Sequence, residues 1–122
     1  MATVRALMGS GFSGGQALAL NQRGAVTASG SNSQANGALL SYGVNDVTTG
    51  ASADSVVLPT SAQGSQPGDE MYVYVGSSTS GKLFPGGSET INGSTSAVTV
   101  AQGKMALCVR TSSTNWGHII TA

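Results

Sequence analysis

Hydrophobic and polar residues alternate with a period of two along much of the second half of the chain. The clearest run is Met71–Val75, where Met71, Val73 and Val75 fall on one side of a predicted strand and two tyrosines on the other. Similar short runs, bounded by Gly, Pro, Ser and Asn, predict further strands at residues 55–58, 96–100, 104–110 and 116–121. We expect 96–100 and 104–110 to form a hairpin through Gln102-Gly103.

The first half of the chain is less regular. It contains plausible short strands at residues 25–28, 38–42 and 44–48, with a polar loop at 30–36. Gln16–Asn21 is too short to be assigned as helix or strand. The spacing of strands and turns predicts an all-β domain, either an antiparallel sandwich or a jelly-roll-like fold.

The first fifteen residues differ in character from the rest of the chain. A mildly apolar start is followed by a glycine-rich stretch, so we interpret residues 1–15 as an extended N-terminal arm and residues 16–122 as one β-domain. A neighbouring subunit could hold this arm in place, and a frayed tail is the alternative. The residues of the arm that we expect at such an interface are Val4, Arg5, Leu7, Met8 and Phe12.

The composition predicts a thin core. Leucine, isoleucine, valine and phenylalanine supply 24 of the 122 residues, a fraction that borders on that of disordered chains. Five basic residues balance five acidic ones, so charge repulsion does not oppose folding. A chain this poor in large side chains gains stability from subunit contacts, and we expect an oligomer or a part of a larger assembly.

Charge and cysteine content exclude several classes of function. The five scattered cations form no basic patch, so we expect no nucleic-acid partner. No apolar run is long enough for a membrane span, and no secretory signal is recognisable. The single cysteine, Cys108, lies in an apolar run, where we expect a buried and unreactive thiol.

The residues that could carry chemistry do not form a recognisable site. Residues 9–14 match G-x-G-x-x-G, a match expected by chance in a chain with 18 glycines. The sole histidine, His118, has no nucleophile elbow to accompany it, so an interface or half-buried position is expected, where it could make assembly pH-sensitive. The carboxylates are scattered, and Asp54 is expected to cap a turn. We therefore predict no enzyme activity, cofactor, metal or small-molecule substrate.

Two further residues have alternative interpretations. Asn92-Gly93-Ser94 has the form of a glycosylation acceptor, but Asn-Gly is better explained as a tight turn after Thr90-Ile91. Trp116 is expected to be an anchor, either in the core or at an interface. Stacking of Trp116 on a carbohydrate is a third option with weak support, because no aromatic cluster accompanies it.

The order of several short motifs resembles a module of tailed-bacteriophage virion proteins. The resemblance covers roughly residues 24–120, and it rests on order and spacing, because each motif alone is partly turn chemistry. The motifs are Asp54–Pro59, Pro67-Gly68-Asp69 before Met71–Val75, Leu83–Gly87, Glu89–Gly93, Ala97–Lys104, Met105–Arg110 and Asn115-Trp116. The stretch Pro85–Ser88 departs from the expected proline-rich loop.

The resemblance implies a β-sandwich or jelly-roll fold and a homotrimer. It implies a capsid decoration (cement) protein that is made in the host cytoplasm and binds the major capsid protein at the virion surface. The alternative within this class is a tail- or fibre-associated component, such as a knob or accessory. A carbohydrate-binding module is the alternative from another class.

Overall fold

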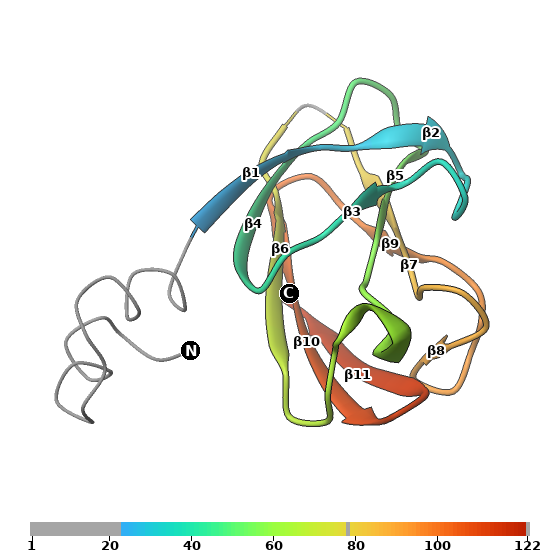
Figure 1. Cartoon of the computed structure of the whole chain (residues 1–122). Coiled ribbons are helices and arrows are strands. Elements are labelled where there is room, and N and C mark those ends of the chain that lie inside the picture. Colours follow the sequence, from blue (N-terminus) through green and yellow to red (C-terminus); the bar gives the residue numbers. More distant parts are fainter. Residues whose placement is uncertain (1–22, 78, 122) are drawn as a thin grey trace, which may run out of the picture.

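The chain folds into two β-sheets packed face to face (Figure 1). This structure, a computed structural model, describes residues 23–77 and 79–121. The arm at residues 1–15, its five expected interface residues, the boundary at residue 16 and the segment Gln16–Asn21 all lie outside the described residues. The prediction of an all-β fold is confirmed, since the described part of the chain contains eleven strands and a single short 3-10 turn, η1 (Ser61–Gln63).

The first sheet has six strands and carries the face that concerns function. In spatial order these are β1 (Arg23–Thr27), β4 (Gly43–Thr48), β6 (Glu70–Val75), β10 (Lys104–Ser112), β11 (Asn115–Ile120) and β8 (Thr90–Ile91). The second sheet has five strands. In the same manner these are β2 (Ser29–Ser31), β5 (Asp54–Val57), β7 (Gly81–Phe84) and β9 (Val98–Val100), with β3 (Ala38–Leu39) also paired to β5.

Both sheets are mixed, which corrects the expectation of an antiparallel sandwich. β4 runs parallel to both β1 and β6, and β5 runs parallel to β7. The reason is that the chain repeatedly crosses between the sheets. It passes from β4 to β5 in the other sheet and then returns to β6, so that β6 lies beside β4 and points the same way. Parallel neighbours need such crossover connections, whereas a hairpin gives an antiparallel pair.

The alternating run that was clearest in the sequence forms β6. Its Met71, Val73 and Val75 are buried, and Tyr72 and Tyr74 lie on the opposite side of the strand. The buried side packs with side chains of the second sheet, including Leu83. This apolar layer between the two sheets is the core of the domain.

The predicted hairpin between residues 96–100 and 104–110 is wrong. β9 pairs with β7 in the second sheet, and β10 pairs with β6 and β11 in the first sheet. The turn at Gln102-Gly103 exists, with the Lys104 N–H donating to the carbonyl of Ala101. The N–H of Gly103 also donates to the carbonyl of Val75 at 2.7 Å, which attaches the turn to the end of β6. The turn therefore carries the chain from one sheet to the other.

Two assignments in the first half need correction. The strand expected at residues 38–42 is limited to β3 at Ala38–Leu39, and β2 at Ser29–Ser31 begins where a polar loop was expected. Both strands pair only with β5 in the described structure. Such short edge strands depend on their partner rather than on their own apolar pattern, so the sequence signal for them is weak.

Predicted turns agree better with the structure. Asn92 and Gly93 have φ values of 50° and 79°, and Ile91 and Ser94 exchange two backbone hydrogen bonds across them. This is the tight turn expected for Asn-Gly, because both central residues need positive φ. Asp54 caps its turn as predicted, with Oδ2 accepting from the N–H of Gly50 at 2.7 Å and of Ala51 at 3.0 Å.

Trp116 lies in the core, completely buried, which excludes the interface and carbohydrate-stacking options for this residue. Its indole ring packs under the guanidinium of Arg110, whose carbon lies 4.9 Å from the ring centroid. Arg110 is itself buried and is paired with Glu89. This pair, to which the sequence pattern assigned no role, helps to hold the Trp116 end of the core.

Cys108 is buried, as predicted. Burial raises the pKa of its thiol to about 12, so the thiol stays protonated at neutral pH and is a poor nucleophile.

Candidate functional site

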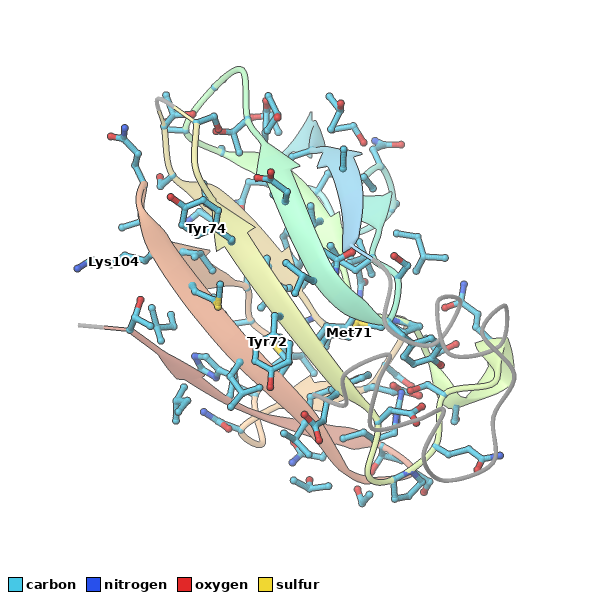
Figure 2. All side chains as sticks on the ribbon, turned by 90° about the vertical axis from the view of Figure 1, so that its left-hand side faces the viewer. Met71, Tyr72, Tyr74 and Lys104 are labelled. Carbon is cyan, nitrogen blue, oxygen red and sulfur yellow. The ribbon has the colours of Figure 1, made fainter. Side chains whose placement is uncertain are left out.

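An apolar surface covers the outer side of the first sheet. We call it the apolar face and define it by six residues on neighbouring strands: Val44, Tyr72, Met105, Leu107, Val109 and Ile119. Figure 2 looks onto this side of the sheet, with Tyr72 and Tyr74 in front of β6. The six side chains lie on the side of the sheet away from the core, since their neighbours along each strand are the buried ones.

The strand register places the centre of this face in one row. Leu107 is paired with Tyr72 on one side and with Ile119 on the other. Tyr72 is in turn paired with Val44. Side chains directly opposite one another on adjacent strands contact each other across the sheet. The row therefore forms a continuous apolar band across four strands.

The band is only partly covered by the described residues. Ile119 is 69% exposed, the largest value among the exposed large hydrophobic side chains of the described structure. Two shallow hollows, of about 250 and about 320 Å³, lie on either side of the band, and both are lined by Leu107 and Ile119. An exposed apolar area with this shape is typical of a contact site for a protein.

The strand β10 explains why the face is apolar. Its inward positions Ala106 and Cys108 are buried in the core, yet its outward positions Met105, Leu107 and Val109 are apolar as well. A strand with one wet face alternates between apolar and polar residues, whereas a strand buried on both sides is apolar throughout. The sequence of β10 is therefore that of a strand covered on both sides. This signal for the site is present in the sequence, although it was not among the features used to predict one.

Polar residues border the apolar face. The hydroxyl of Tyr72 donates to Oε2 of Glu70 at 3.4 Å. Loss of hydration, and then the negative charge of Glu70, raise the pKa of the Tyr72 hydroxyl above its ordinary value. Tyr72 therefore stays protonated at neutral pH and keeps its hydrogen-bond donor. Asp46 and Lys104 lie further along the same sheet, at the positions paired with Tyr74 and Val75.

His118 lies next to the band but is held by a polar contact. Its side chain is half-buried, and its Nδ1 is 2.8 Å from Nδ2 of Asn92. The same Asn92 accepts from the N–H of His118 at 3.0 Å through Oδ1. Because Asn92 Nδ2 is a donor, this contact favours the His118 tautomer with its proton on Nε2. The side chain of Asn92 thus continues the edge of β11 where β8 ends.

The structure brings only one residue of the expected interface set near the apolar face, namely His118. Trp116 is in the core, and the five arm residues lie outside the described part of the chain. Within residues 23–77 and 79–121, no group of three or more His, Cys, Asp or Glu side chains is arranged to hold a metal ion. The described residues also contain no helix long and apolar enough to cross a membrane.

A second exposed apolar side chain, Leu39, lies on the other sheet. It is 53% exposed, and it lines a hollow of about 360 Å³ together with Val57 and polar loop residues. Because Leu39 belongs to β3 and not to the band, it is a matched control for Ile119.

Comparisons with known proteins identify no relative. The chain matches no protein-family model, and no curated protein is similar to it.

Proposed function

We propose that the chain is a virion structural protein of a tailed bacteriophage, which decorates the outer shell of the capsid as a homotrimer. The observation that carries this proposal is the apolar face, whose outward Leu107 and Ile119 need a covering partner. A band of this kind, on a chain with a thin core, favours a protein that gains its stability in an assembly.

The positions of the phage-like motifs support the proposal. Each motif of the resemblance falls at a strand end or turn of the structure. Pro59 follows the end of β5, Pro67-Gly68-Asp69 precedes β6, and Asn92-Gly93 follows β8. Residues that resemble a family in order and spacing therefore also have the structural roles that such punctuation serves.

The proposed mode of action is the addition of many modest contacts. The chain is rich in Ser, Thr and Gly, and it has no net charge. Each copy would contribute a small apolar contact to the major capsid protein or to its sister copies. Repetition over a symmetric shell then gives strong attachment without any single strong site.

The direct experiment is electron microscopy of purified particles. We expect density for this chain at local threefold positions, in many copies per capsid. A few copies at the tail vertex would contradict the proposal and favour the tail- or fibre-associated alternative. Particles that lack the protein altogether would exclude both.

Attachment can also be tested with variants. Ile119→Asp places a charge in the centre of the apolar face and should reduce binding to particles that lack the protein at least tenfold. Leu39→Asp changes another exposed apolar side chain, on the second sheet, and should leave binding unchanged. Equal binding of both variants would show that the apolar face is not the contact surface.

A further inference from the structure

The apolar face has no cover among the described residues, yet the described chain begins beside it. The first described residue, Arg23, is paired with Val44 in β4. Val44 starts the row that continues through Tyr72 and Leu107 to Ile119. The preceding segment of the chain therefore joins the sheet at the end of the apolar band.

The direction of β1 favours the same side of the sheet. Figure 2 views the molecule from the left of Figure 1 and shows Tyr72 and Tyr74 in front of the sheet, so the outer side of the first sheet faces left in Figure 1. The N-terminal end of β1 lies at the left edge of the sandwich in Figure 1. The chain therefore enters β1 from the side on which the apolar face lies.

The segment before β1 has matching chemistry. Ala17-Leu18-Ala19-Leu20 is uncharged and apolar, and it lies three residues before Arg23 along the chain. In an extended conformation Leu18 and Leu20 point to the same side, so one side of the segment is entirely leucine. Burying leucine on both partners is favourable by roughly 1.5–3 kcal/mol for each side chain that is fully covered.

The length of the connection is sufficient. From β1 to β11 there are four strand spacings, roughly 19 Å in total. Six extended residues span roughly 20 Å. Residues 17–22 can therefore reach from the start of β1 to Ile119 without disturbing the sheet.

From these observations we propose that Ala17–Leu20 pack on the apolar face, with the side chains of Leu18 and Leu20 against Leu107 and Ile119. The segment comes from the same chain or is exchanged between copies through the same contacts. This docking goes beyond the virion role and does not depend on it.

Methyl NMR of the full chain tests the docking. Leu18→Ser and Leu20→Ser should shift the methyl resonances of Leu107 and Ile119 and leave those of Leu83, in the core, unchanged. The matched control is Val4→Ser with Leu7→Ser, earlier in the same segment, which should leave Leu107 and Ile119 unchanged. Unshifted Leu107 and Ile119 resonances in the Leu18 and Leu20 variants would overturn the proposal, as would equal shifts in the control.

Cross-linking identifies the chain that supplies the segment. In a Cys108→Ala background, Leu18→Cys with Ile119→Cys should form a disulfide at least ten times faster than Leu18→Cys with Leu39→Cys. Equal rates would overturn the proposal. A link within one chain supports the docking and counts against the apolar face as a trimer contact, whereas a link between isotopically distinct copies supports both. Dimers that form through Ile119→Cys alone, without the cysteine at position 18, would show that a second face is the occupant and overturn the proposal.

Discussion

The guanidinium of Arg110 donates from Nη2 to Oε1 of Glu89 at 2.7 Å inside the sandwich, with side-chain exposures of 0% and 9%. Arg110 also donates from Nε to the hydroxyl of Ser65 at 2.7 Å and from Nη2 to the carbonyl of Pro59 at 2.8 Å. Oε2 of Glu89 accepts from the N–H of Ser61 at 2.9 Å. One buried cation therefore ties β10 to the loop after β5 and to the segment before β8.

Arg110→Met should destabilise the domain strongly. Removal of one partner leaves the carboxylate of Glu89 buried without its counterion, at a cost of about 3–5 kcal/mol. Urea unfolding measures this directly. Lys82→Met is the control, because it removes a cation whose bond to Thr99 lies at the surface, and it should change the free energy of unfolding by less than about 0.5 kcal/mol. The double variant Arg110→Met with Glu89→Leu should be more stable than Arg110→Met alone, and a less stable double variant would contradict this account.

Gly93→Ala tests the turn that ends β8. Gly93 has φ of 79°, and a Cβ added there meets no atom within 4 Å. Any loss of stability then comes from the backbone conformation alone, and we expect about 1 kcal/mol. Thermal or urea unfolding measures it. Gly50→Ala, at a glycine outside the positive-φ region, should be neutral or slightly stabilising. An equal loss in both variants would show that φ is not the cause.

Cys108 should make the domain less stable in alkaline solution. Its pKa is raised from 9.0 in the unfolded reference to about 12 in the folded state. Below about pH 9 the thiol is protonated in both states and contributes no pH dependence. Between about pH 9 and about pH 12 the unfolded thiol ionises while the folded one does not, so the stability contribution falls as pH rises. Urea unfolding of wild type and Cys108→Ala should diverge across this window, and parallel curves would contradict the raised pKa.

Trp116→Ala should unfold or severely weaken the domain rather than remove a ligand contact. The indole is fully buried, and its truncation leaves a cavity that costs about 3–5 kcal/mol. Circular dichroism and urea unfolding measure the loss. Trp116→Phe keeps most of the volume and should be milder. Glycan binding that is lost in a folded Trp116→Phe variant would contradict the core assignment.

The sequence predicts local features of this fold better than it predicts pairing. The alternation of Met71–Val75 and the positive-φ preference of Asn92-Gly93 are local properties, and the structure confirms both. The partner of β9 was predicted incorrectly, because an alternating strand fits either sheet and a short Gly turn permits both a hairpin and a crossing. Pairing depends on contacts distant in sequence, and a single chain does not reveal them.

The candidate site was missed for a related reason. Period two separates Met105, Leu107 and Val109 from Ala106, Cys108 and Arg110, and hydrophobicity alone would place the first set in the core. The structure places the second set inside, because Arg110 finds Glu89 and small residues leave room for Trp116. Only the apolar character of both sides of β10 indicated a strand covered on both faces.

The most direct test of the account is the mass of the protein in solution, with and without a charge in the apolar face. Sedimentation equilibrium of the wild type should give three times the chain mass of 12.0 kDa, and Leu39→Asp should give the same value. Ile119→Asp should give a folded monomer. A wild type that stays at 12.0 kDa, or an Ile119→Asp variant that remains a trimer, would contradict the claim that the apolar face is an assembly surface.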